Sequence, residues 1–413
     1  MEPLVVTPDF DPNGRMVRAI FDGDIEPIEW IMPEDYGPGF SNDGSSNFLA
    51  IMTMPYAMAL GRDLHIRGQV CPILLGNLER LMHNRVAFHS RGFKHVKITA
   101  EKTDVVSVYD PKAPHIAAYS GGVDATYCIG KNFHDTSSFM HRPVGATLTI
   151  GGFGYSLEEQ RDFNRARAKA AQLGARYNFK SYAMICNSSV QAKKSWGIKS
   201  FSPHVQAHPM FIASCLNLFS KDFGGGLFAA DFSYLDEPHV LPWSSQSVTH
   251  PLLSSSGFHI NAVGADADRP VKLSFLHENN LLSDIVLCGA SRSLEKNCGT
   301  CRKCRRTIIM CLSRDIDPTN LFAEIPEKDE LVLHGFKKNT EYAFAIASLR
   351  NWQSEDHQDI RLQLWKEVRN YSHEKLVKEK RQMRRGIGPM PADAADKTTR
   401  GFPFAKWFTV KTH

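Results

Sequence analysis

The sequence predicts an α/β protein built around a doubly wound, mainly parallel sheet. Between residues 106 and 315, stretches with strand character alternate with stretches of helical periodicity, an order typical of parallel sheets covered by helices. A glycine-rich turn at residues 120–124 directly follows an apolar run at 116–119 and directly precedes a helical pattern. The chain has 413 residues, 42% hydrophobic and 23% charged, so it can hold further folding units. We expect an N-terminal α+β unit at residues 1–105 and a helical extension at 316–413.

The N-terminal unit shows strand patterns and one clear helix, but no motif that carries chemistry. The predicted strands are 16–21, 25–32 and 95–100, and residues 37–47 are rich in Gly, Asn and Ser, as loops are. A helix is predicted from Pro72, at a first-turn position, with an apolar face formed by Ile73, Leu74, Leu78, Leu81 and Met82. The apolar run at 48–60 contains Pro55 and is too short for a membrane span, so we interpret it as core.

The central and C-terminal regions continue this pattern. Further strands are predicted at 146–150, 182–186 and 227–231, and further helices at 157–173, 204–219, 341–352 and 359–371. The helix at 157–173 is expected to begin with a capping pair, Ser156 and Glu159, and to end at Gly174.

The turn at residues 120–124 has the composition of a phosphate site. Gly121 and Gly122 allow successive backbone N–H groups to point into one concavity, which the positive end of the following helix also faces. Ser120 and Thr126 can add hydroxyl donors, and Asp124 can hold the Mg²⁺ that accompanies ATP. An ordinary strand-to-helix turn is the alternative.

Four cysteines near the end of the central region have the spacing of a metal site. Cys288, Cys298, Cys301 and Cys304 follow the pattern Cys-x9-Cys-x2-Cys-x2-Cys within seventeen residues. Four thiolates complete a tetrahedral Zn²⁺ site and leave no open position for water, so we expect a structural zinc rather than a catalytic one. Disulfides or four unrelated buried thiols are the alternatives.

The order Ser-Gly-Gly-Val-Asp at positions 120–124 resembles the signature of the PP-loop ATP pyrophosphatases. That resemblance implies an adenine nucleotide α-hydrolase-like fold and cleavage of ATP between its α and β phosphates, with an adenylated intermediate. The backbone of Gly121, Gly122 and Val123 and the Ser120 hydroxyl would hold the phosphates, and Asp124 would position Mg²⁺. One position departs from the signature, because Ala125 stands where a hydroxyl residue usually follows the aspartate.

The four-cysteine segment after this loop resembles the 7-cyano-7-deazaguanine synthase branch of that superfamily, over residues 112–312. Enzymes of this branch activate a carboxylate with ATP, form an amide with ammonia and then form a nitrile. The resemblance therefore implies an AMP-forming ligase that uses ATP, Mg²⁺ and a structural Zn²⁺, acting on a small-molecule acid and on ammonia or an amine. Relatives use the same activation to modify proteins, so a protein acceptor is a further expectation.

Several other polar stretches are candidates for ligand contacts. The glycines at 151–154 follow a predicted strand, and Gly152 and Phe153 can pack against adenine, although a tight turn explains them equally well. Glycines 224–226 bring the backbone close to a ligand or mark a turn, and the hydroxyl-rich residues 243–252 are better explained as a solvated linker than as substrate contacts. The group Asp266, Asp268 and Arg269 suits either Mg²⁺ or substrate binding, or a helix start.

Composition indicates compartment and partners. The net charge of +5 permits an anionic substrate without indicating nucleic-acid binding, and the basic residues between 375 and 385 are better explained as a solvated helix face than as an RNA contact. The first residues lack a signal-peptide pattern and the chain has nine cysteines, which predicts a cytoplasmic protein outside the membrane. The aromatic tail at 402–408 is expected to dock on this chain or on a second copy, as in a homodimer.

Three other functions fit parts of the sequence. A tRNA-thiolating enzyme would need a cysteine pair near the nucleotide, for which Cys128 and Cys186 are candidates. Argininosuccinate- or asparagine-type synthesis is a second alternative. The third is a non-catalytic protein that binds zinc and RNA and keeps a degenerate loop, for which Ala125 is the main support.

Overall fold

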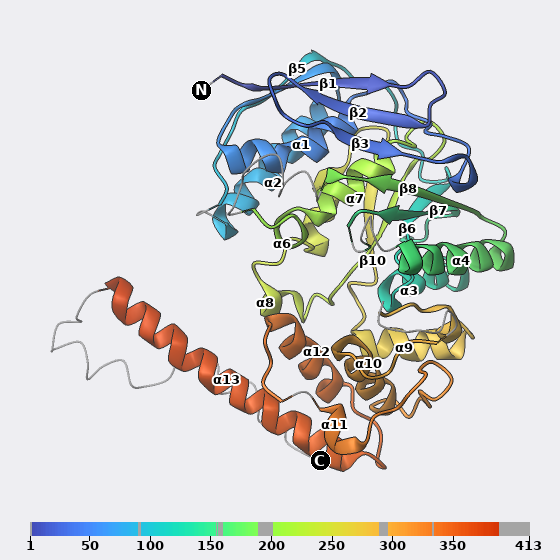
Figure 1. The fold of residues 1–413 in the computed structure, drawn as a ribbon, viewed down its shortest axis with the longest axis vertical. Coiled ribbons are helices and arrows are strands. Elements are labelled where there is room, and N and C mark those ends of the chain that lie inside the picture. Colours follow the sequence, from blue (N-terminus) through green and yellow to red (C-terminus); the bar gives the residue numbers. More distant parts are fainter. Residues whose placement is uncertain are drawn as a thin grey trace.

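The computed structural model describes residues 2–89, 92–153, 155, 160–188, 201–288, 296–332 and 334–387, the last of these from 373 onward by backbone alone. Its strands, in chain order, are β1 (Leu4–Phe10), β2 (Met16–Phe21), β3 (Ile28–Ile31), β4 (Leu64–Val70), β5 (Ile98–Thr103), β6 (His115–Ala118), β7 (Val144–Gly151), β8 (Lys180–Cys186), β9 (Gly225–Ala229) and β10 (His259–Val263). They form one ten-stranded sheet in the order β10-β9-β6-β7-β8-β3-β2-β1-β4-β5 (Figure 1).

Half of this sheet is the parallel, doubly wound unit that the sequence predicts. Strands β10, β9, β6, β7 and β8 all pair in parallel. The chain adds β7 and β8 on one side of β6 and then crosses to the other side to add β9 and β10. The strand order therefore reverses between β6 and β9, and ligands of open α/β sheets bind outside the carboxyl ends of the strands at such a point.

The N-terminal strands extend the same sheet. Trp30 of β3 pairs with Cys186 of β8 in an antiparallel register, and β1 and β2 continue the antiparallel pairing. Strands β4 and β5 then run parallel to β1. The sheet is thus mixed but mostly parallel. It is continuous between the strands of residues 1–105, predicted as an N-terminal unit, and the strands of the central region.

Helices cover both faces of the sheet. They are α1 (Asn47–Leu60), α2 (Pro72–Phe88), α3 (Val123–His134), α4 (Gln160–Tyr177), α6 (Pro203–Gln206), α7 (His208–Asn217), α8 (Glu237–Val240), α9 (Arg269–Glu278), α10 (Arg302–Leu312), α11 (Lys328–Leu331), α12 (Asn339–Arg350) and α13 (Gln358–Ile387), with short 3₁₀ turns η1 (Glu34–Tyr36), η2 (Ser247–Leu253) and η3 (Leu282–Asp284). Neighbouring residues of β6 belong to different cores: Ile116 packs with α1 and α7, whereas Ala117 packs with α3, α9 and α10. This alternation is expected of a strand buried on both faces.

Local sequence explains where several elements begin. The apolar run at 48–60 forms α1, which is buried almost all round, as a helix apolar on every face should be. Pro72 stands in the first turn of α2 and Pro270 in the first turn of α9, where proline costs no hydrogen bond. The predicted helix at 204–219 is instead two helices, because the chain breaks at Ala207 and restarts with Pro209 in the first turn of α7.

Other boundaries differ from the sequence prediction. Helix α4 does not end at Gly174 but continues to Tyr177, and Asn178 then takes the left-handed conformation with φ 58°. Gly174 is needed for packing, since a Cβ there would lie 2.6 Å from the Phe179 carbonyl oxygen. The predicted cap at Ser156 and Glu159 lies outside the described residues. Strand β5 is displaced from the predicted 95–100, and β1 and β4 were not predicted.

The C-terminal part is helical, as predicted. Helix α12 packs against α8, α9, α10 and α13, and α13 extends as a long helix away from the body of the molecule (Figure 1). The tail from residue 389, including the aromatic residues at 402–408, lies outside the described residues. Within the part of the chain that the structure describes, no helix has both the length and the apolar composition needed to cross a membrane.

Candidate active site

The glycine-rich loop lies at the reversal point of the sheet. It leaves the carboxyl end of β6 and enters α3, whose N-cap is Gly122. Gly121 has φ 68°, and a Cβ there would lie 3.1 Å from the Val286 Cβ, so both backbone conformation and packing require glycine. The turn therefore brings backbone N–H groups of the first turn of α3, which have no acceptor within the helix, to the place where ligands bind in this class of sheet.

The predicted site residues of this loop differ in exposure. Ser120 is exposed, and its carbonyl accepts a hydrogen bond from the Tyr155 hydroxyl. Thr126 is fully buried, and its amide donates to the Gly122 carbonyl over 3.0 Å. Ala125 is buried in the apolar core beneath the loop. The position that departs from the PP-loop signature therefore faces the interior of this fold.

Asp124 is held by two cations from α9. Its carboxylate accepts from the Arg269 guanidinium, and Lys272 Nζ lies 3.0 Å from its Oδ1 atom. Lys272 also donates to the Ala230 carbonyl over 2.7 Å, and Arg269 contacts the Asp231 carbonyl over 3.4 Å. The ion pairs thus join α3 and α9 to the carboxyl end of β9.

Asp231, which was not singled out for a site, stands across the reversal point from the glycine loop. Its Oδ2 atom lies 3.5 Å from His208 Nε2 and accepts from the Trp243 indole N–H over 3.0 Å. Burial alone would raise the pKa of Asp231, but the hydrogen bonds from His208 and Trp243 outweigh it and lower the pKa. His208 Nδ1 faces the His204 carbonyl at 2.8 Å. No local motif marks this group, because its members come from three separate segments of the chain, at residues 204–208, 231 and 243.

The hydroxyl-rich segment at 243–252 is not the solvated linker that the sequence favoured. Most of it is buried, including Ser244, Ser247 and His250. Tertiary hydrogen bonds satisfy its backbone: Glu237 accepts from the Ser247 amide over 2.7 Å, and Arg85 donates to the Ser244 carbonyl over 2.6 Å. The segment therefore forms part of the interior below Asp231.

The other candidate ligand contacts have packing roles in this structure. Gly152 has φ 99°, and the ring centres of Phe153 and Phe211 lie 5.4 Å apart, which fits the tight-turn alternative. Gly225 must be small, since a Cβ there would lie 2.3 Å from the His259 carbonyl oxygen of β10. Asp268 is the N-cap residue of α9, which fits the helix-start alternative for residues 266–269.

The structure gathers the four predicted metal ligands into one cluster. The sulfur atoms of Cys288, Cys298, Cys301 and Cys304 all lie within 4.8 Å of one another, and Cys288 and Cys304 are separated by 3.4 Å. A tetrahedral zinc with bonds of about 2.3 Å places sulfurs about 3.8 Å apart, so the cluster fits that ion. All four are free thiols, which rules out the disulfide alternative for this structure.

The electrostatics of the cluster also suit a cation. Hydrogen bonds from Cys301 and Cys304 lower the pKa of Cys288, while the same hydrogen bonds to Cys288 raise the pKa values of Cys301 and Cys304. The first thiolate therefore forms easily and the next ones do not, unless a positive ion compensates their charge.

The cysteine cluster is connected directly to the glycine loop. The Val286 amide donates to the Gly121 carbonyl over 2.6 Å, two residues before Cys288. Asn297 fixes the same segment, since its Oδ1 accepts from the Leu287 amide over 2.8 Å and its Nδ2 contacts the Ile285 and Leu321 carbonyls over 3.3 Å. Cys301 is the N-cap of α10, so a bound metal would hold the start of that helix.

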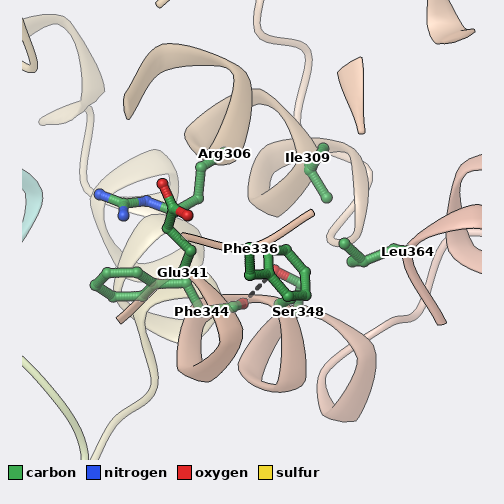
Figure 2. A pocket seen from close by; sticks show the side chains of 8 residues that line it. Arg306, Ile309, Phe336, Glu341, Phe344, Ser348 and Leu364 are labelled. Carbon is green, nitrogen blue, oxygen red and sulfur yellow. Dashed lines mark hydrogen bonds between the residues drawn. The ribbon is translucent and has the colours of Figure 1, made fainter. Parts of the chain in front are cut away.

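Two arginines in the first turns of α10, Arg302 and Arg306, face α12. Arg302 forms a bidentate ion pair with Glu341, with N–O distances of 2.7 and 2.8 Å. Arg306 reaches a small pocket between α10, α12 and α13, where Arg306, Glu341 and Phe344 lie at one end and Ile309 and Leu364 at the other (Figure 2). Burial, followed by the charge of Arg269, lowers the pKa of Arg306 to about 9.

The two cysteines predicted as a thiolation pair, Cys128 and Cys186, lie in different cores of the described structure. Burial raises the pKa of Cys128 to about 12, so its thiol is unreactive at neutral pH. Cys186 belongs to the other core, where its neighbouring thiol is Cys215.

Comparison of this chain with protein-family models, with curated proteins and with solved structures found no match.

Proposed function

We propose that the chain is an ATP-dependent, AMP-forming ligase of the PP-loop type. The observation that carries this proposal is the loop at 120–124, which combines a left-handed glycine, an exposed serine and the N-terminus of α3 at the reversal point of a parallel sheet. This arrangement suits polyphosphate binding by backbone donors.

In the proposed reaction a substrate carboxylate attacks the α-phosphorus of ATP, and pyrophosphate leaves. The backbone N–H groups of residues 121–123 and the Ser120 hydroxyl would stabilise the charge that develops on the departing phosphates, as preorganised donors do. Ammonia or an amine then displaces AMP from the adenylate and forms an amide. This scheme needs no covalent enzyme nucleophile, which agrees with the unreactive state of Cys128.

The metals would have separate roles. Magnesium bound with ATP would supply charge neutralisation at the phosphates, and Asp124 is the loop carboxylate that can hold it. Zinc at the four cysteines would have no open coordination position and would stabilise the segment that contacts Gly121.

The substrate class rests on the resemblance to the 7-cyano-7-deazaguanine synthase branch, which combines the same loop with a four-cysteine segment. A 7-deazaguanine carboxylic acid is therefore the first acid to test. A protein acceptor is the second, because the resemblance extends to relatives that modify proteins.

The experiment is mass spectrometry of a reaction with zinc-loaded protein, ATP, Mg²⁺, ammonium and 7-carboxy-7-deazaguanine. We expect AMP together with the amide or the nitrile. Asp124→Asn should abolish AMP formation, while Asp135→Asn, at the opposite end of α3, should leave it intact. Retained activity in Asp124→Asn would contradict the role of the loop, and failure to bind ATP at all would contradict the ligase proposal.

A further inference from the structure

Three cationic side chains converge beside the glycine loop. Arg269 and Lys272 project from α9, and Arg306 projects from α10, which packs against α9. The guanidinium carbons of Arg269 and Arg306 lie 4.1 and 4.0 Å from the centre of the same ring, that of Phe344 on α12. The three cations therefore connect α10, which begins at the four cysteines, with α9, which faces Asp124.

The positive charges of this cluster exceed the carboxylates that pair with them. Asp124 forms ion pairs with both Arg269 and Lys272. Among the described residues, Arg306 has no ion pair, and its buried Nε atom has no hydrogen-bond acceptor. Glu341 does not supply one, because Arg302 holds both of its oxygens and the Lys337 amide donates to one of them over 2.8 Å.

Asp231 does not balance the excess either. Its carboxylate is occupied by His208 and Trp243, and only its backbone carbonyl contacts Arg269. Two guanidinium groups that share one aromatic ring repel each other, and cation–π contact with Phe344 offsets only part of that repulsion. An anion that contacts both groups would offset it.

We propose that Arg269, Lys272 and Arg306 form a subsite for a diphosphate group, with Arg306 contributing its planar pair of donors. Lys272 and Arg269 contact the carboxyl end of β9, next to the loop that follows β6, so the subsite lies at the reversal point of the sheet. In the free protein Asp124 pairs with two of the cations, Arg269 and Lys272, and its single charge balances only one of them. When a diphosphate binds, these cations turn to its oxygens and Asp124 becomes available for Mg²⁺.

The choice of diphosphate rests on the proposed function, whereas the existence of an anion site does not. A diphosphate carries enough charge and enough oxygens to engage three cations at once, and a guanidinium binds phosphate through two parallel hydrogen bonds. The group can be free pyrophosphate or the β and γ phosphates of ATP.

Calorimetric titration of the full, metal-loaded chain with Mg²⁺ separates these sources. The probes are inorganic pyrophosphate, α,β-methylene-ATP and AMP, which lacks the diphosphate. We expect Arg306→Gln to weaken binding of the first two by about tenfold to hundredfold, the usual effect of losing charged hydrogen bonds. AMP binding should not change. Lys303→Gln removes a positive charge from an exposed position on the same helix and should leave every affinity as it was.

Each outcome decides the inference. The inference would be overturned if Arg306→Gln bound pyrophosphate and α,β-methylene-ATP as tightly as the unsubstituted chain does. It would also be overturned if the variant lost as much affinity for AMP as for the other two probes. Weakening confined to α,β-methylene-ATP would identify the nucleotide's own diphosphate as the ligand. Should Arg306→Gln fail to fold, Arg306→Lys keeps the charge without the planar donors, and an unchanged affinity in that variant would also overturn the assignment.

The test also distinguishes this inference from the proposed function. Arg306-dependent pyrophosphate binding without AMP formation from any acid would leave the subsite standing and the ligase proposal refuted. Normal AMP formation, with pyrophosphate and ATP-analogue binding that does not depend on Arg306, would support the ligase proposal and refute the subsite.

Discussion

The amide of Val286 donates a 2.6 Å hydrogen bond to the carbonyl of Gly121. This contact joins residues that are far apart in the chain and ties the glycine loop to the segment that continues to Cys288. The loop conformation and the order of the cysteine cluster should therefore depend on each other.

Gly121→Ala should distort the loop. Alanine is disfavoured at φ 68°, and its Cβ would lie 3.1 Å from that of Val286, so the free energy of unfolding should fall by about 1–2 kcal/mol. ATP affinity should fall as well, because the backbone donors move. Denaturant unfolding and ATP titration measure the two effects. Gly76→Ala is the matched control: nothing lies within 4 Å of its added Cβ inside α2, and it should stabilise by about 0.5–1 kcal/mol. Equal effects of the two substitutions would contradict this account.

Removing the metal should loosen the glycine loop together with the cysteine segment. Elemental analysis should find one zinc per chain, and Cys301→Ala should lose it, with a decrease of several kcal/mol in the free energy of unfolding. Hydrogen exchange should then increase at residues 286–288 and also at 121–123. Cys311→Ala, a buried thiol outside the cluster, should keep the zinc. Faster exchange limited to the cysteine segment would show that the two sites are independent.

The sequence could predict the features that depend on neighbouring residues. The strand, turn and helix around residues 116–134 and the spacing of four thiols are local patterns, and the structure confirms the elements and the cluster. Pairings between distant segments were not predictable. Arg269 and Lys272 lie 145 and 148 residues from Asp124 in the chain, and nothing in their local pattern indicates that they meet it.

Burial of the segment at 243–252 shows the same limit. Serine and threonine in a run indicate solvent only if their backbone groups lack other partners. Here Arg85 and Glu237 provide those partners from distant positions. The N-terminal strands join the sheet through the pairing of Trp30 with Cys186, a register that no single segment encodes.

Two buried histidines should make the fold sensitive to acid. Burial lowers the pKa of His250 to about 3 and that of His115 to about 4, so both are neutral in the folded chain. The unfolded chain takes up their protons below about pH 6.5, so stability is complete above that pH. Between about pH 6 and 5 the loss of unfolding free energy should approach about 1.4 kcal/mol per pH unit for each histidine, and it should level off as the pH reaches the folded pKa of each.

Substitution of one of these histidines tests the expected loss of unfolding free energy at acid pH. His250 packs 4.4 Å from Phe228, and His250→Phe should keep that contact while removing one titration, which flattens the acid slope. Unfolding free energies measured at several pH values give the slope. His277→Gln, at an exposed position, should leave the slope as it is. A slope unchanged by His250→Phe would place the acid sensitivity elsewhere.

Arg350 should be essential for the packing of α12 against α8 and α9. Its Nη2 atom lies 2.9 Å from Asp236 and 2.6 Å from Asp268, the N-cap residue of α9, and both carboxylates are buried. Arg350→Met would leave two buried acids without their cation, a change that typically costs about 3–5 kcal/mol. Their pKa values should then rise, so the loss should shrink as pH falls and the acids become protonated. Unfolding measured at pH 7 and pH 5 reads both effects, and Arg361→Met on the exposed face of α13 should show neither. A loss independent of pH would mean that Arg350 acts through packing of its aliphatic stem rather than through its charge.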